Sequence, residues 1–200
     1  ARCLDYLRGG RATSRVGPLN WFARCEMAAK PKYYLETTVI IDILEHPPDA
    51  DICRAVAQLM ERAENRDCEI FTSSVTMIEV LYAEHEKTNQ KPSPAITQQI
   101  MALWHPDSSP IQIVPATELL TRKAIETFRH HWQKDGWSSS KGKDILHLVS
   151  AQKAKVDTFY STEGDMKKWA PVMGFTVDRP TFAEPPGGAA TLFTKKNNPK

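Results

Sequence analysis

The chain has 200 residues, of which 41% are hydrophobic and 25% are charged, a composition typical of a soluble globular protein with one domain. The formal net charge is only +2, so the chain has no strong overall field that would attract nucleic acid, and any basic surface must be local. No apolar run approaches the roughly 20 residues of a membrane-spanning helix, which excludes a membrane protein.

The four cysteines have no C-x-x-C spacing, so neither a zinc site nor a redox dithiol is indicated, and we predict a reduced, cytoplasmic protein. Residues 1–26 contain five arginines and little apolar periodicity. We expect this segment to be disordered or a non-native extension, with translation starting at Met27; a basic transit peptide is the alternative. Residues 183–200 include Pro-Pro-Gly-Gly and a polar end, which predicts a flexible tail after a domain over residues 32–182.

In chain order, the predicted elements alternate between strand and helix. We expect strands over residues 32–37, 68–72, 111–114, 158–161 and 175–177. We expect helices over residues 39–44, 49–65, 76–86, 94–104, 117–132, 144–154 and 165–170. This alternation predicts an α/β fold, a three-layer α/β/α sandwich with a mostly parallel sheet of about five strands.

Acidic residues recur where the predicted strands end or the next helices begin. Glu36 ends the first strand, and Glu79 lies in the helix after the second. Asp144 opens the helix before the fourth strand, and Glu163 and Asp165 follow that strand. The carboxyl ends of parallel strands line one crevice, so these carboxylates are expected to meet there. A bound cation relieves their repulsion, and oxygen ligands indicate Mg²⁺ or Mn²⁺.

The segments that contain these acids resemble the PIN domain, named after the PilT N-terminus, in their order and spacing. They read Glu-Thr-Thr-Val from Glu36, Thr-Met-Ile-Glu-Val-Leu from Thr76, Lys-Asp-Ile-Leu-His from Lys143 and Ser-Thr-Glu-Gly-Asp from Ser161. The resemblance implies a metal-dependent endoribonuclease, and in particular a toxin of the virulence-associated protein C type with an antitoxin partner and a homodimeric state. It also implies that Glu36, Glu79 and Asp144 are the central acids.

The same resemblance assigns the fourth acidic position to Glu163 or Asp165 and gives Thr38 the task of steadying the first acid. Glu36 and Glu163 stand where the family usually has the shorter aspartate, which predicts a lower metal affinity. A PIN-like RNA-binding module with weakened catalysis therefore stays open, as does a structure-specific DNA nuclease. Single-stranded RNA is the expected substrate, with Lys141 and Lys143 as candidate phosphate contacts.

Each of these residues also has a purely structural interpretation. Glu79 has capping-box spacing from Thr76, and Asp144 favours a helix N-terminus by its charge alone. Glu163 and Asp165 are common turn residues, and Lys141 and Lys143 suit a solvated loop. His147, one helical turn beyond Asp144, is either a group that supports the acids or an incidental histidine on the helix surface.

Overall fold

Five parallel strands form the central sheet of the computed structural model, which describes residues 29–47, 50–81, 86, 91–107, 109–135 and 142–183. The strands are β1 (Lys32–Leu35), β2 (Glu69–Ser73), β3 (Ile111–Val114), β4 (Thr158–Tyr160) and β5 (Thr176–Asp178). Their order in the sheet is β3-β2-β1-β4-β5, and every neighbouring pair is parallel. The predicted parallel, five-stranded α/β fold is confirmed.

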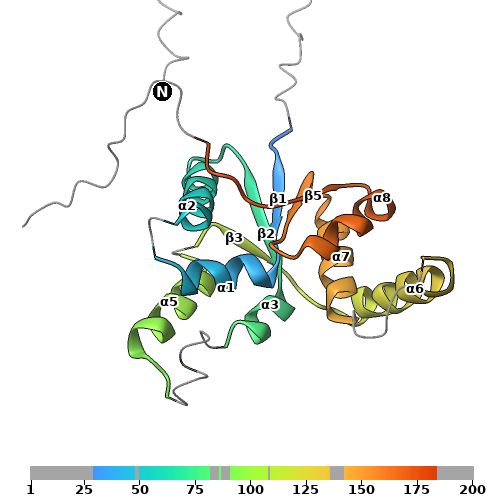
Figure 1. Cartoon of the computed structure of the whole chain (residues 1–200), viewed down its shortest axis with the longest axis horizontal. Coiled ribbons are helices and arrows are strands. Elements are labelled where there is room, and N and C mark those ends of the chain that lie inside the picture. The colour runs from blue at the N-terminus through green and yellow to red at the C-terminus, as the bar shows by residue number, and fades with distance from the viewer. Residues whose placement is uncertain are drawn as a thin grey trace, which may run out of the picture.

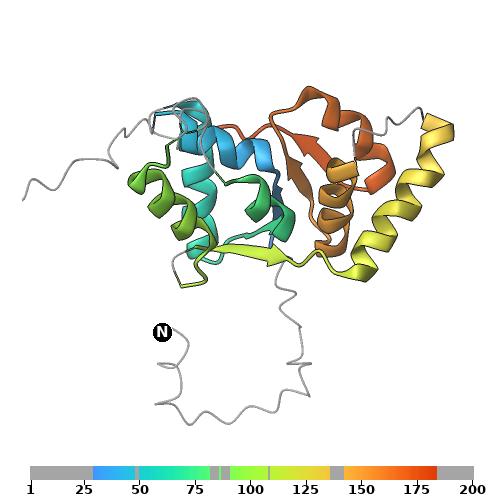
Figure 2. The same ribbon diagram turned by 90° about the horizontal axis from the view of Figure 1, so that it is seen from below.

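Helices cover both faces of this sheet (Figures 1 and 2). One face carries α1 (Thr37–Glu45), α2 (Asp51–Glu64) and α5 (Pro94–Trp104), and the other carries α6 (Glu118–Asp135), α7 (Gly142–Ala154) and α8 (Ala170–Met173). The short helix α3 (Ser74–Glu79) follows β2 directly, and a 3₁₀ helix, η2 (Gly164–Trp169), precedes α8. The molecule therefore has the three layers that the sequence predicts.

The two faces of the sheet bury different side chains because successive residues of a strand point to opposite sides. Tyr34 of β1 pairs in register with Phe71 and Phe159, and all three pack against α6, α7 and α8. The next residue, Leu35, packs on the opposite face with Ile70, α1 and α2. Both faces are apolar, as is usual for a parallel sheet between two helical layers.

The order in which the chain adds strands to the sheet reverses at β1. From β1 the chain adds β2 and β3 on one side, and β4 and β5 later extend the sheet on the other. The residues after β1 and β4 therefore meet, and the backbone N–H of Glu36 donates to the carbonyl of Tyr160 at 3.0 Å. In open α/β sheets such a switch point forms the ligand crevice at the carboxyl ends of the strands.

Several predicted boundaries differ from those in the structure, and two of the differences have clear local reasons. The first strand ends at Leu35 rather than at residue 37, because the Glu36 side chain caps α1 by accepting from the Thr38 backbone N–H at 3.0 Å. The helix predicted over residues 76–86 begins at Ser74, and α3 ends at Glu79. Its cap is the Ser73 hydroxyl, which accepts from the Val75 N–H at 3.2 Å, so the capping box proposed for Thr76 and Glu79 does not form.

Several expectations fall outside the described residues. These are the disorder of residues 1–26, the tail beyond Ala183 and the contact proposed for Lys141. Ala183 itself is fixed on α2, where its carbonyl accepts from the Gln58 side chain at 3.0 Å. Among the residues that the structure describes, no helix combines the length and the apolar character needed to cross a membrane.

Candidate active site

A cavity of about 450 Å³ opens at the carboxyl ends of the strands. Four of the predicted acids line it: Glu36, Glu79, Asp144 and Glu163. They come from four separate segments, namely the end of β1, the end of α3, the first turn of α7 and the turn after β4. The fold therefore brings together acids that are up to 127 residues apart in the sequence.

Glu36 is the most buried of these acids, with only 7% of its surface exposed. Its Oε2 accepts hydrogen bonds from the Thr38 backbone N–H at 3.0 Å, from the Thr38 hydroxyl, and from the Ser161 hydroxyl at 3.3 Å. Burial raises the pKa of Glu36 above its ordinary value, and the hydrogen bonds from Thr38 oppose that rise. Thr38 and Ser161 thus fix this carboxylate at the junction of β1 and β4.

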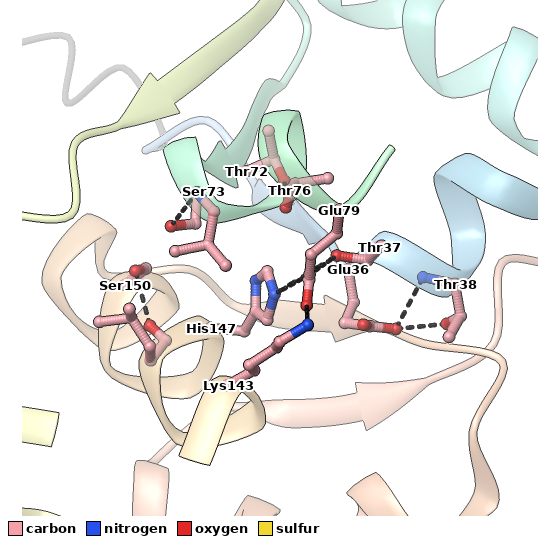
Figure 3. Close-up of polar contacts among 12 residues, drawn as sticks. Glu36, Thr37, Thr38, Thr72, Ser73, Thr76, Glu79, Lys143, His147 and Ser150 are labelled. Carbon is pink, nitrogen blue, oxygen red and sulfur yellow. Dashed lines mark hydrogen bonds and ion pairs between the residues drawn. The ribbon is translucent and has the colours of Figure 1, made fainter. Parts of the chain in front are cut away.

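Glu79 is bound by three donors from two other helices (Figure 3). Its Oε2 accepts from the Thr37 hydroxyl at 2.5 Å and contacts His147 Nε2 at 2.9 Å, and its Oε1 lies 3.2 Å from the Lys143 ammonium. Burial raises the pKa of Glu79, but the hydrogen bonds from His147 and Thr37 outweigh it and lower the pKa to about 2. Glu79 is therefore a carboxylate at neutral pH.

Asp144 and Glu163 complete the acidic wall from the other side of the switch point. Asp144 lies in the first turn of α7, where its Oδ2 is buried from solvent. Glu163 is exposed, and its backbone N–H donates at 3.0 Å to the Ser161 hydroxyl, which itself donates to Glu36. Asp165 does not line the cavity: it is exposed in η2, with an ion pair to Lys168 at 3.7 Å. The structure therefore does not place Asp165 with the other four acids.

Part of the cavity wall is apolar. This part consists of Ile41 from α1 and of Val75, Ile78 and Leu81 in and after α3. Ile78 and Leu81 are 68% and 64% exposed. The sequence analysis did not single out this wall, because its residues have the same apolar character as the core.

His147 is a site residue for which the sequence left two interpretations open, and the structure agrees with a group that supports the acids. It is 1% exposed rather than on the helix surface, because α7 is enclosed between the sheet and α6. Its two ring nitrogens contact the Tyr34 hydroxyl at 2.8 Å and Glu79 Oε2 at 2.9 Å. The signal was present in the sequence: the run Ile145–Ala151 is largely apolar around the whole helix, which is typical of a buried helix.

The donor set fits a hard divalent cation, because every acid that lines the cavity offers carboxylate oxygens. In the described part of the chain, however, no group of three or more His, Cys, Asp or Glu side chains is already close enough to hold an ion. The geometry accounts for this, since Thr38 binds one oxygen of Glu36 and Lys143 pairs with one oxygen of Glu79. For three of these carboxylates to bind one cation together, some of the side chains must rotate.

Comparison with known proteins identifies the family and agrees with the fold. A family model for the PIN domain matches residues 33–170. Similar solved structures include VapBC2 from Rickettsia felis bound to a promoter DNA fragment, with a TM-score of 0.50 and 15% identity over 74% of this chain and 98% of the other. VapC20 from Mycobacterium tuberculosis, a toxin that cleaves the sarcin–ricin loop, has a TM-score of 0.50 and 16% identity over 74% and 99%.

A search of curated proteins by comparison with this chain finds no match. The two structural relatives share less than a fifth of their residues with it, so they support the fold alone. The family model, in contrast, spans all three central acids, Glu36, Glu79 and Asp144, and more than half of the sequence. The chain belongs to the PIN domain family.

Proposed function

We propose that this chain is a metal-dependent endoribonuclease that hydrolyses phosphodiester bonds of single-stranded RNA. The observation that carries the proposal is the meeting of Glu36, Glu79, Asp144 and Glu163 in one cavity. Membership of the PIN domain family supports a nuclease. The chemistry of the donor set favours Mg²⁺ or Mn²⁺ over softer metals.

In this proposal the four carboxylates bind the cation and do not attack the substrate. A bound divalent cation lowers the pKa of a water molecule and offsets negative charge on the phosphate. Glu36 and Glu79 are already fixed by hydrogen bonds, and Glu163 is the exposed member of the four. Lys143, whose side chain is 74% exposed at the edge of the cavity, is placed to contact a substrate phosphate.

The biological role that we propose is that of the toxin in a toxin–antitoxin pair in the cytoplasm. The fold that the chain shares with VapBC2 and with VapC20, a toxin that cleaves the sarcin–ricin loop, is the basis on which we propose a protein partner and an RNA substrate. A homodimer is also proposed, from the family resemblance. Trp132, Ile125 and Leu119 of α6 are exposed apolar side chains that a partner surface could cover.

Cleavage assays with purified protein test the enzymatic part of the proposal. We expect cutting of single-stranded RNA with Mg²⁺ or Mn²⁺, loss of cutting in EDTA, and loss in the Asp144→Asn variant, which keeps the side-chain shape without the charge. Parallel assays with single-stranded and branched DNA distinguish the DNA nuclease. Cleavage that survives EDTA contradicts the proposal.

A binding module without catalysis is the second candidate, and one observation favours it. In the described residues no three potential ligands lie close enough together to hold an ion, and the Lys143 ammonium already pairs with Glu79. Calorimetric titration with Mn²⁺ separates the two candidates. Carboxylate-dependent binding supports the nuclease, whereas RNA binding without any metal binding supports the module.

A further inference from the structure

A series of buried polar contacts links the core of the sheet to the acidic cavity. The Tyr34 hydroxyl lies 2.8 Å from His147 Nδ1, and His147 Nε2 lies 2.9 Å from Glu79 Oε2. Tyr34 is fully buried and His147 is 1% exposed. The tyrosine ring is itself fixed, because it stacks on Phe159 with the ring centres 5.0 Å apart. The histidine therefore has little freedom to turn.

The directions of the hydrogen bonds between Tyr34, His147 and Glu79 follow from the groups at the two ends of this series of contacts. Both oxygens of Glu79 act as acceptors, Oε2 from the Thr37 hydroxyl and Oε1 from the Lys143 ammonium. The carboxylate consequently has no proton to donate, and His147 Nε2 must carry the proton that lies between them. In a neutral imidazole ring Nδ1 is then the acceptor, and the Tyr34 hydroxyl donates to it.

This arrangement determines which oxygen of Glu79 faces the cavity. Oε2 is engaged by two donors, at 2.5 Å from Thr37 and at 2.9 Å from His147, while Oε1 points to the exposed Lys143. Rotation of the carboxylate would leave the buried His147 N–H with only the longer contact to the Thr37 hydroxyl, at 3.3 Å, and the loss of its charged acceptor is costly. An exposed lysine such as Lys143 cannot impose that restraint, because its side chain is long and solvated.

We propose that His147, itself held by Tyr34, is a positioning residue that fixes the Glu79 carboxylate with Oε1 directed into the cavity, where it is presented to a divalent cation. The proposal rests on the proposed function, since it concerns the same acidic site. Groups that hydrogen-bond to metal ligands commonly change metal affinity about 10- to 100-fold when they are removed.

Mn²⁺ affinity, measured by calorimetry on four variants of the whole chain, tests this role. His147→Leu removes the donor and is expected to weaken Mn²⁺ binding about 10- to 100-fold. His147→Gln places an amide nitrogen near the position of Nε2 and should restore most of the affinity. Tyr34→Phe keeps the stacked ring and loses only the hydroxyl, and it should weaken binding about 2- to 10-fold.

Ser150→Ala is the matched control. Ser150 is also fully buried on α7, but its hydroxyl donates only to the Leu146 carbonyl, at 2.7 Å. This variant should bind Mn²⁺ like the wild type, which excludes a general loss of packing as the cause. Wild-type affinity in both His147→Leu and Tyr34→Phe overturns the positioning role. If His147→Leu does not fold, Tyr34→Phe and His147→Gln decide the question.

Crystal structures of the wild type and of the His147 and Tyr34 variants give a readout that needs no metal. We expect Glu79 to keep its contact with Thr37 in His147→Gln and to turn away from it in His147→Leu. An unchanged carboxylate in His147→Leu overturns the positioning role even where the metal chemistry is correct. Failure of the wild type to bind Mn²⁺ overturns the proposed function instead, and the position of Glu79 then still decides the positioning role.

Discussion

The Thr37 hydroxyl donates to Glu79 Oε2 across 2.5 Å and thereby joins the first residue of α1 to the last residue of α3. The hydroxyl is buried, and the Glu79 side chain is only 17% exposed. Hydrogen bonds to a charged acceptor are stronger in such surroundings than in water. The orientation of Glu79 therefore depends on the point where β1 turns into α1, the same point at which Glu36 is fixed.

A double-mutant cycle of Thr37→Val and Glu79→Gln should measure this coupling. Because the acceptor is charged, we expect a coupling energy of about 1.5–3 kcal/mol in the free energy of unfolding. Urea unfolding of the metal-free protein gives the four values that are needed. If the changes in the free energy of unfolding caused by the two single substitutions add up to that of the double variant within about 0.5 kcal/mol, the contact does not stabilise the fold.

Thr38→Val should destabilise the protein by about 1–3 kcal/mol, because the Thr38 hydroxyl takes part in two hydrogen bonds. It donates to Glu36 Oε2 and accepts from the Thr162 backbone N–H at 3.3 Å, so it links the start of α1 to the turn after β4. Thr121→Val is the matched control, since that hydroxyl is exposed and bonds only to the Thr117 carbonyl of its own helix. Equal destabilisation of both variants in urea would rule out the proposed tie.

The sequence predicts the meeting of the acids because topology alone brings them together. Once the strands are parallel, the residues that follow β1 and β4 must lie at the same edge of the sheet. The proximity of Glu36 and Glu163 can therefore be predicted without knowing any specific contact between side chains. Asp165 shows the limit of that argument. It lies only two residues beyond Glu163, but η2 begins at Gly164 and turns it out to solvent.

The partners of the acids are harder to predict, because they depend on side chains from distant segments. Thr76 and Glu79 have the spacing of a capping box, but Thr76 bonds to Thr72 at 2.8 Å and Glu79 bonds to Thr37. Likewise, the spacing of Asp144 and His147 places both on one helical face without revealing that α6 covers α7. In these cases contacts between distant segments, rather than local sequence patterns, determine the partners of the side chains.

Cys68 should react with thiol reagents much more slowly than Cys53 in the folded protein. Cys68 is 3% exposed and its thiol donates to the Leu59 carbonyl at 3.7 Å, whereas Cys53 is partly exposed. Burial raises the pKa of the Cys68 thiol, so less of the reactive thiolate forms at a given pH. Iodoacetamide labelling between pH 7 and 9, mapped by mass spectrometry, separates the two residues.

Labelling of the urea-unfolded chain provides the control for the cysteines, because both should then react at similar rates. The raised pKa also means that deprotonation above the ordinary thiol value favours the unfolded state, so the contribution of Cys68 to stability is complete below that value and declines as the pH rises through it. Equally fast labelling of Cys68 and Cys53 in the folded protein would contradict the buried position of Cys68 in the structure.

Lys143→Met should change metal binding and RNA binding in opposite directions. Lys143 pairs with Glu79 Oε1 at 3.2 Å, so its positive charge competes with a cation for that oxygen. An exposed ion pair of this kind is worth about 0.2–1 kcal/mol, and its loss should strengthen Mn²⁺ binding by up to about fivefold. RNA binding should weaken, and the slope of log affinity against log salt should fall by about 0.7, the value for one phosphate contact with a single strand.

Lys153→Met is the matched control, since Lys153 lies in the last turn of the same helix, α7, and its loss changes the net charge by the same amount. Calorimetry with Mn²⁺ and RNA titrations in EDTA at several salt concentrations give both readouts for each variant. Because the Lys143 side chain is 74% exposed, its loss should not alter folding, so the two effects can be compared directly. Weaker Mn²⁺ binding in Lys143→Met would show that Lys143 does not compete with the metal for the Glu79 oxygen. An RNA salt slope equal to that of the control would show that Lys143 is not a phosphate contact.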